Sequence, residues 1–222
     1  MIRINNLSKR FGHDNLFENV NLVIHPGDKI ALLGQNGSGK STFIKCIIGE
    51  VQFDSGIIEK TEGIQISVMV QEKEFEESEN NFIDYLYERS VILKNKAIDL
   101  EKKFQDPKIY DDEIEFQKII REHEFLVNQS NQTFEDSKIK EILKRLCFEE
   151  ENYNTPLYKL SGGQKMKLRI AECLAKKADM YILDEPTNHL DFNTMNQLDI
   201  ELTKKETVII ISHDRYLLNK FA

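Results

Sequence analysis

Eight consecutive residues, Gly34 to Ser41, constrain the fold of this chain more than any other feature of its sequence. They read Gly-Gln-Asn-Gly-Ser-Gly-Lys-Ser and match the pattern G-x-x-x-x-G-K-S/T. The apolar run Lys29–Leu33 precedes them and suits a buried strand, and an amphipathic helical pattern follows them. A glycine-rich turn between a strand and a helix points backbone N–H groups at an anion, and the helix amino terminus adds positive potential. We therefore expect a phosphate-binding loop within an α/β fold.

The side chains of this loop predict a nucleoside triphosphate as its ligand. Lys40 is placed as a point charge on the β and γ phosphates, and the Ser41 hydroxyl is placed as a ligand for Mg²⁺. The backbone of the remaining residues cradles the phosphates. The nucleotide-binding residues expected here are Gly34, Gln35, Asn36, Gly37, Ser38, Gly39, Lys40, Ser41 and Thr42.

Two adjacent carboxylates follow a second apolar run. Residues Met180–Leu183 read as a buried strand that delivers Asp184 and Glu185 at its end. Asp184 can hold Mg²⁺ through water, and Glu185 is suited to polarise an attacking water molecule. The simpler alternative is an acidic loop that follows a buried strand.

The segment Leu160–Gln164 reads Leu-Ser-Gly-Gly-Gln and makes the pattern specific. The chain here resembles the nucleotide-binding domain of ATP-binding cassette (ABC) proteins, of which LSGGQ is the signature. Gln71 is similar to the Q-loop glutamine of that family, and Phe11 is similar to its adenine-stacking aromatic residue. The stretch His189–Asp191 resembles the D-loop, and His213 resembles the switch histidine.

The resemblance implies an α/β P-loop NTPase cassette with a parallel core sheet, an N-terminal antiparallel β region and an inserted helical subdomain. It also implies a Mg²⁺-dependent ATPase, with ATP and Mg²⁺ as cofactors and Phe11 beside the base. The catalytic residues so implied are Glu185, His213 and Gln71, and the Mg²⁺ ligands are Ser41, Gln71 and Asp184.

Two cassettes face each other head to tail in this family. The resemblance implies that Ser161, Gly163 and Gln164 contact the nucleotide held by the partner, not the one held by Lys40. A helix amino terminus with exposed N–H groups is an anion site that a γ-phosphate would complete. We therefore expect a second ABC cassette, in the same or a linked chain, as the partner.

Several of these residues have simpler explanations that the sequence leaves open. Phe11 could be a core aromatic residue beside Phe17, and Gln71 could be an ordinary exposed loop residue. His213 could only terminate its strand, and Ser161 could only cap a helix.

The middle of the chain differs from both ends. Residues 81–147 contain one Pro and no Gly, and their apolar residues recur at helical intervals. We expect one nucleotide-binding domain over residues 1–222, with residues 1–79 and 148–222 as the ATPase core. Residues 80–147 would form the helical subdomain with a possible arm insert. The family normally continues with closing strands after the switch histidine, so a truncated carboxyl end is also expected.

Composition limits the partners and the cellular compartment that we expect for this chain. Thirty basic and 38 acidic residues leave a net charge of −8, which does not favour a bulk electrostatic grip on nucleic acid. The three cysteines lie far apart, as free thiols in a reducing compartment do. No apolar run approaches the roughly 18 residues that would cross a bilayer. We expect a cytoplasmic chain without direct membrane insertion.

Two further segments resemble the ABC-F branch, whose members act on ribosomes. These are Pro186–Asp191, which reads PTNHLD, and Ser212–Tyr216, which reads SHDRY. The long interval between Gln71 and Leu160 has room for the helical arm of that branch. This favours a ribosome-associated translation factor or antibiotic-resistance ATPase that touches rRNA or tRNA. The alternative is the ATP-binding subunit of a membrane ABC transporter, paired with a transmembrane permease subunit.

Overall fold

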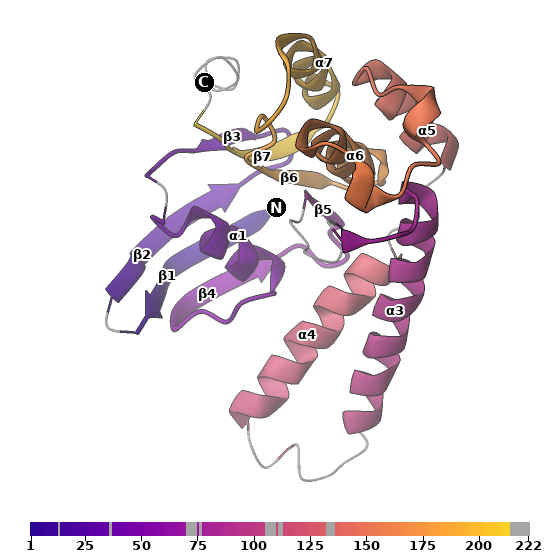
Figure 1. Ribbon diagram of the computed structural model, residues 1–222. Coiled ribbons are helices and arrows are strands. Elements are labelled where there is room, and N and C mark those ends of the chain that lie inside the picture. The colour runs from indigo at the N-terminus through magenta and orange to yellow at the C-terminus, as the bar shows by residue number, and fades with distance from the viewer. Residues whose placement is uncertain are drawn as a thin grey trace.

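Four short strands of β-branched and apolar residues form a parallel sheet in the middle of the molecule (Figure 1). They are β3 (Lys29–Leu32), β5 (Ile66–Met69), β6 (Met180–Asp184) and β7 (Thr207–Ile211). Their order is β3-β7-β6-β5, and every neighbouring pair is parallel. The computed structural model describes residues 1–12, 14–35, 37–69, 75, 77–104, 110, 113–131 and 136–213.

A second, antiparallel sheet comes from the amino-terminal part of the chain. Its strands β1 (Ile2–Phe11), β2 (Asp14–Ile24) and β4 (Ser55–Lys60) are arranged in the order β2-β1-β4. Strand β4 was not expected from the sequence. It is an edge strand on which Ile57 is 58% exposed, so its apolar pattern is too weak to predict a strand.

The helices lie outside these strands. Helix α1 (Lys40–Ile48) follows β3, and helix α6 (Gly162–Ala175) leads into β6. The remaining α-helices are α3 (Phe82–Lys103), α4 (Glu113–Asn131), α5 (Asp136–Arg145) and α7 (Phe192–Thr203), and short 3-10 turns cover Glu150–Asn152 and Leu157–Lys159.

The parallel sheet is buried on both faces, because successive side chains of a strand point in opposite directions. One face packs on α1 and the antiparallel sheet, through Ile66, Val68, Met180, Ile182, Ile209 and Ile211. The other face packs on α5, α6, α7 and the first turn of α3, through Met69, Tyr181, Leu183, Val208 and Ile210.

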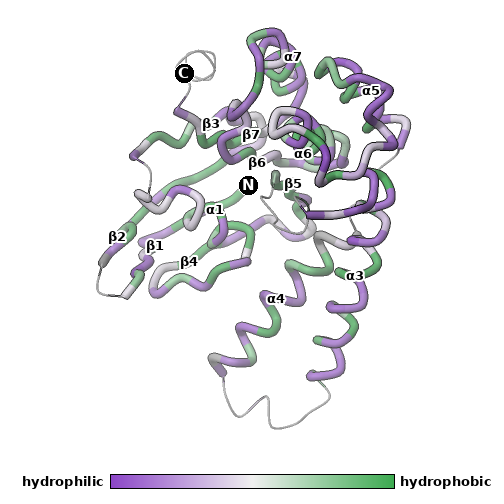
Figure 2. The backbone as a smooth tube through the Cα atoms, in the orientation of Figure 1, coloured by the Kyte–Doolittle hydropathy of each residue, from purple (hydrophilic) through white to green (hydrophobic). Residues whose placement is uncertain are grey.

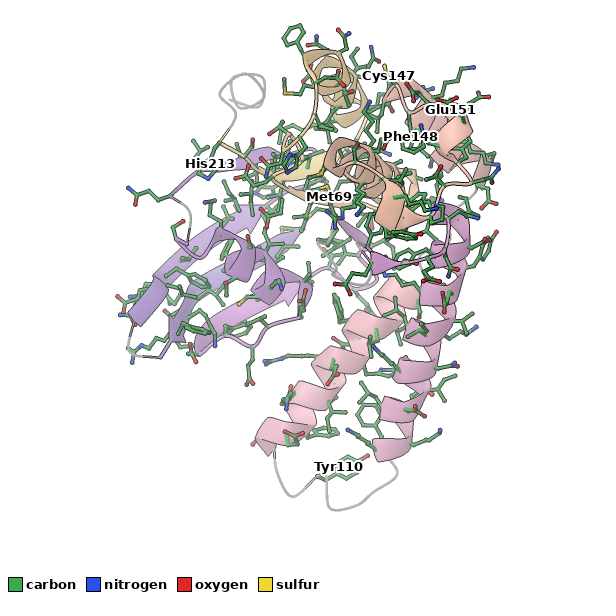
Figure 3. All side chains as sticks on the ribbon, viewed as in Figure 1. Met69, Tyr110, Cys147, Phe148, Glu151 and His213 are labelled. Atoms are coloured by element: carbon green, nitrogen blue, oxygen red, sulfur yellow. The ribbon has the colours of Figure 1, made fainter. Side chains whose placement is uncertain are left out.

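Helices α3 and α4 form a hairpin that extends away from the two sheets (Figure 1). With 22 and 19 residues, they span about 33 Å and 28 Å at the usual helical rise. Tyr110 marks the far end in Figure 3, where its hydroxyl donates a hydrogen bond of 3.0 Å to the Phe104 carbonyl. The hairpin, which we call the arm, has its own small core of Ala97, Leu100, Ile119 and Leu126.

Hydrophobic and hydrophilic residues alternate along both helices of the arm (Figure 2). Leu86, Ala97 and Leu100 of α3 are buried, as expected from the helical spacing of apolar residues in this part of the chain. These residues belong to two different cores: Leu86 is part of the main core, whereas Ala97 and Leu100 pack against α4. Within the described ranges, no helix combines the length and apolar character that crossing a membrane requires.

The predicted fold class is therefore confirmed: an α/β fold with a parallel sheet, an N-terminal antiparallel sheet and a helical insert. The strands expected at Lys29–Leu33 and Met180–Leu183 each differ from the observed β3 and β6 by one residue at the carboxyl end. Strands β1 and β2 pair over almost their full lengths as a long hairpin.

Candidate functional site

The carboxyl ends of the parallel strands meet at one edge of the sheet, where open α/β folds bind their ligands. The phosphate-binding loop follows β3, Asp184 ends β6, and His213 lies two residues beyond β7. Figure 3 labels His213 just past this end of the sheet. The strand order places β7 between β3 and β6, so residues far apart in sequence converge here.

The loop backbone requires glycine where it enters α1. Gly39 precedes the helix with φ of 89°, in the left-handed region that other residues rarely adopt. Lys40, the first residue of α1, turns its ammonium group back onto the loop. Its Nζ donates hydrogen bonds of 2.8 Å to the Gly34 carbonyl and 2.9 Å to the Gln35 carbonyl. A cation is thereby held over the concave side of the loop.

The next residue joins the loop to the neighbouring strand. The Ser41 hydroxyl donates a hydrogen bond of 2.5 Å to Asp184 Oδ2. A hydroxyl and a carboxylate in contact are an all-oxygen donor set, which is what Mg²⁺ prefers. The residues present therefore fit a magnesium ion at this position.

Glu185 follows Asp184 in an unusual backbone conformation. Its φ is 49°, and its N–H donates a hydrogen bond of 2.8 Å to the Ile211 carbonyl. Its Oε1 lies 3.2 Å from Nε2 of His213. Non-glycine residues held at positive φ are concentrated at functional sites, because the surrounding structure must over-determine them. The strand end thus aims one carboxylate toward the loop and the next toward the histidine.

One open cleft of about 300 Å³ is lined by Lys40, Ser41, Asp184 and Glu185. The sequence analysis missed two of its walls, Leu16 from β2 and Ile211 from β7, because neither belongs to a motif. The Cβ atom of Leu16 would lie 3.2 Å from a Cβ added at position 39, so Leu16 packs closely against the loop at Gly39. The described residues that line the cleft are Leu16, Gly37, Gly39, Lys40, Ser41, Thr42, Asp184, Glu185 and Ile211.

The signature segment forms the exposed amino end of α6. Ser161 caps the helix by accepting a 3.2 Å hydrogen bond from the Gln164 N–H, and the Gln164 side chain accepts a 2.9 Å bond from the Ser161 N–H. This reciprocal arrangement is a capping box. Among the described residues that line the cleft, none comes from this segment.

The D-loop packs directly behind the signature glycines. A Cβ added to Gly163 would lie 2.7 Å from the carbonyl oxygen of His189, which has φ of 64°. Asp191 caps α7 through a hydrogen bond of 2.8 Å from the Thr194 N–H, and this bond lowers the pKa of Asp191 below its ordinary value. Lys167 of α6 lies 3.6 Å from the same carboxylate.

Phe11 is not a core residue. Its side chain is 79% exposed at the end of β1, whereas Phe17 packs edge-on against Phe43 with ring centroids 5.5 Å apart. An exposed aromatic ring is free to stack on a base, so the adenine-binding role stays a prediction that the structure permits. Gln71 and Asn36 lie outside the described residues, as does Arg215 of the second ABC-F-like segment.

Comparison with known proteins identifies a family model described as "ABC transporter", which matches residues 17–188. The protein YkpA of Bacillus subtilis, an uncharacterised ABC transporter ATP-binding protein, is 37% identical over 227 residues. That alignment covers 99% of this chain and 40% of YkpA. The chain thus spans less than half the length of this relative.

Two further relatives carry more specific names. ABC transporter F family member 2 of Arabidopsis thaliana is 28% identical, over 99% of this chain and 33% of that protein. The ribosome protection protein VmlR of Bacillus subtilis is 29% identical, over 99% of this chain and 32% of that protein.

The solved structures agree on the fold. One of them, the dimeric post-hydrolysis state of the ATP-binding cassette MJ0796 bound to ADP and Pi, superposes with a TM-score of 0.64. It is 21% identical in sequence, and the match covers 99% of this chain and 91% of that one. The resemblance drawn from the motifs is confirmed, and this chain belongs to the ABC transporter family.

Proposed function

We propose that this chain is an ATPase cassette that hydrolyses ATP to ADP and phosphate with Mg²⁺. The observation that carries the proposal is the convergence of Lys40, the Ser41–Asp184 pair and Glu185 on one cleft, with His213 in contact with Glu185. A triphosphate bound to the loop would lie near Asp184 and Glu185, because both carboxylates line the same cleft as Lys40. A simple glycine-rich turn would not need this set of partners.

The chain's own groups divide the chemistry among them. Lys40 and the loop N–H groups bind and orient the phosphates, and Glu185 accepts the proton of the attacking water. The water oxygen forms the new bond to the γ-phosphorus as the bond to the bridging oxygen breaks. His213, 3.2 Å from Glu185, holds that carboxylate in place. Ser41 and Asp184 are the described residues that would hold Mg²⁺, which neutralises charge on the phosphates when bound. Gln71 is proposed as a further ligand.

The second cassette supplies the missing side of the site. Ser161, Gly163 and Gln164 stand apart from the cleft of their own chain, at an exposed helix amino terminus suited to an anion. Head-to-tail pairing with a second cassette, in the same or a linked chain, would bring this segment onto the partner's γ-phosphate. Hydrolysis then rises more than linearly with protein concentration.

We further propose that the cassette works in the cytoplasm in a ribosome-associated cycle, as a translation factor or in antibiotic resistance. The arm supports this, because α3 and α4 extend well beyond the sheets and pack mainly on each other. Relatives named as an F family member and as a ribosome protection protein support it as well. We assign residues 80–147 to the helical subdomain that carries the arm, and residues 1–79 and 148–222 to the ATPase core.

The second candidate function is the ATP-binding subunit of a membrane transporter. It is favoured by the name of YkpA, an ABC transporter ATP-binding protein. In that case the helical subdomain would contact a transmembrane permease subunit instead of rRNA or tRNA.

Replacing Glu185 with Gln tests the catalytic assignment. Loss of a general base costs about 10²- to 10⁴-fold in rate, so the variant should bind ATP and accumulate as a paired-cassette state that size-exclusion chromatography detects. Glu151→Gln, an exposed position on the 3-10 turn at Glu150–Asn152, is the matched control and should behave as wild type. Unchanged turnover in Glu185→Gln would remove Glu185 from this role.

The Glu185→Gln variant also distinguishes the ribosome-associated function from the transporter function. With ATP present, the trapped state should sediment with ribosomes in a sucrose gradient, and it should not do so with ADP. Co-purification with a permease in detergent, without ribosome binding, would favour the transporter.

A further inference from the structure

One face of helix α6 is joined to the base of the arm by a buried ion cluster. Arg89 of α3 places Nη1 2.7 Å from Oε1 of Glu172, and Lys176 places Nζ 2.8 Å from the same oxygen. The three side chains are only 15%, 12% and 5% exposed. Burial raises the pKa of Glu172, but Lys176 and Arg89 outweigh it and hold the pKa at about 2. The carboxylate therefore stays charged and paired.

A second contact lies about one turn closer to the signature. The guanidinium of Arg169 on α6 lies over the ring of Phe75, 4.8 Å from its centroid. Phe75 in turn packs edge-on against Phe82 and Tyr85 of α3, at centroid distances of 6.0 and 5.4 Å. Cation–π contacts of this kind strengthen when they are desolvated, and Arg169 is only 9% exposed.

The two contacts form one continuous strip, because residues three and four apart share a face of a helix. Positions 82, 85 and 89 supply it from α3, positions 169 and 172 supply it from α6, and position 176 is the C-cap of α6. We call this strip the clasp; its members are Phe75, Phe82, Tyr85, Arg89, Arg169, Glu172 and Lys176.

A clasp of this kind fixes geometry more than it adds stability. The desolvation of buried charges offsets much of their attraction, and an apolar replacement is often as stable. Ion pairs and cation–π contacts are directional, however, so they hold two helices in one register. Ser161 is the N-cap of the same helix, about 12 to 17 Å along its axis from Arg169 and Glu172.

We propose that the clasp positions the signature serine, so that the base of the arm and Ser161 move as one unit. Arg89 is then a positioning residue for hydrolysis, although it does not touch the nucleotide. This inference rests on the proposed head-to-tail pairing, in which Ser161 serves the partner's site. Since α3 continues for about 20 Å beyond Arg89 and packs on α4, the clasp is a route by which a ligand of the arm would act on α6. Helix α4 makes a separate contact with the core, where the Arg121 guanidinium lies 5.2 Å from the centroid of the Phe53 ring.

The decisive variant is Arg89→Met, which removes one partner and leaves Glu172 paired with Lys176. The chain offers a matched control in Arg145→Met. Arg145 Nη1 lies 3.0 Å from the buried Glu201, which keeps its pair with Lys204 at 2.6 Å. This second cluster joins α5 to α7 and does not include α6.

A misplaced catalytic group can cost roughly 10²-fold, so we expect Arg89→Met to lower kcat by about ten- to a hundred-fold. The affinity of the dilute chain for a fluorescent ATP analogue should stay unchanged, since Lys40 is untouched. Arg89→Lys, which keeps the charge, should recover most of kcat. Arg145→Met should lower the unfolding midpoint without this loss of kcat.

A mixing experiment assigns Arg89 to its half of the site. When Arg89→Met and Lys40→Ala chains are mixed, each mixed pair contains one complete site. That site combines the intact loop of the Arg89→Met chain with the intact signature of the Lys40→Ala chain. Random pairing should restore about a quarter of the wild-type rate, because half of the pairs are mixed and each holds one complete site of two. A mixture of Arg89→Met and Ser161→Ala chains contains no complete site, because both variants impair the signature, and it should restore no ATPase activity.

The outcomes separate the inference from the function it rests on. If Ser161→Ala and Lys40→Ala complement each other but Arg89→Met and Lys40→Ala do not, the clasp does not act through the signature and the inference is wrong. If Ser161→Ala and Lys40→Ala also fail to complement, head-to-tail pairing of this chain is wrong, and the clasp inference falls with it.

Discussion

Replacement of Gly163 by Ala probes the contact between the signature and the D-loop. The new Cβ would lie 2.7 Å from the His189 carbonyl oxygen, a backbone atom that no rotamer change can move away. The neighbouring Gly162 is the matched control, because a Cβ there would meet only the His189 ring at 3.6 Å, an ordinary contact. The two positions are adjacent in the first turn of α6, so both gain the same helix propensity.

The expected magnitude follows from this geometry. Relieving the clash requires a shift of several tenths of an ångström in the D-loop or in α6. Overpacking of this kind costs about 1 to 3 kcal/mol, and replacing Gly by Ala in a helix returns at most about 1 kcal/mol. Gly163→Ala should therefore be about 1 to 3 kcal/mol less stable than Gly162→Ala. For a chain of this size the gap is about 2 to 12 °C in Tm.

Urea unfolding, followed by circular dichroism, measures the gap directly. ATP hydrolysis by Gly163→Ala should also fall, because the shift displaces either Ser161 or the D-loop. Equal unfolding midpoints for the two variants would refute the reasoning, since they would mean that the D-loop does not press on Gly163 in solution.

Two further predictions concern the base contact and the buried carboxylate. Phe11→Ala should raise KM for ATP with little change in stability, since stacking contributes about 1 to 3 kcal/mol and the ring is 79% exposed. Phe17→Ala should instead lower the unfolding midpoint, and the same KM in wild type and Phe11→Ala would count against stacking. Because the pKa of Glu172 is lowered from 4.5 to about 2, the stability it contributes is present above pH 4.5 and is lost as the pH falls toward 2. Glu172→Gln should flatten that part of the stability curve while Glu151→Gln should not, and equal slopes in wild type and Glu172→Gln would contradict the lowered pKa.

The residues at strand ends were the part of the site that the sequence could predict. The glycine loop before Lys40 and the paired Asp184 and Glu185 each follow an apolar run, and parallel strands bring such ends to one edge. The 2.5 Å contact between Ser41 and Asp184 joins two residues that were each expected, from separate motifs, to bind Mg²⁺.

Other features of the structure could not be predicted, because no local pattern in the sequence indicates them. Strand β4 could not be predicted because Ile57 faces solvent, and α5 joins the main core although it lies in the same helical stretch of sequence as the arm helices. The exposure of Phe11 was left open for the same reason, since an aromatic residue in a strand suits a core as well as a surface. The clasp depends on Arg89 and Glu172 meeting across two helices, which helical periodicity within either segment cannot reveal.

If the chain hydrolyses ATP as proposed, the lysine that would bind the phosphates and the signature serine lie on helices that pack on opposite faces of one sheet. Helix α1, which carries Lys40, packs on the face shared with the antiparallel sheet, whereas α6, α7 and the base of the arm pack on the other. Strand β6 lies between these two sets of helices and ends at Asp184, and Glu185 follows it. We propose that these two carboxylates act in both binding and hydrolysis. A displacement of α3 therefore reaches Ser161 through α6 without passing through the phosphate loop. Because of this separation, Arg89→Met should change kcat at constant nucleotide affinity and Lys40→Ala should lower that affinity, and parallel changes in both variants would show that the two faces are not independent.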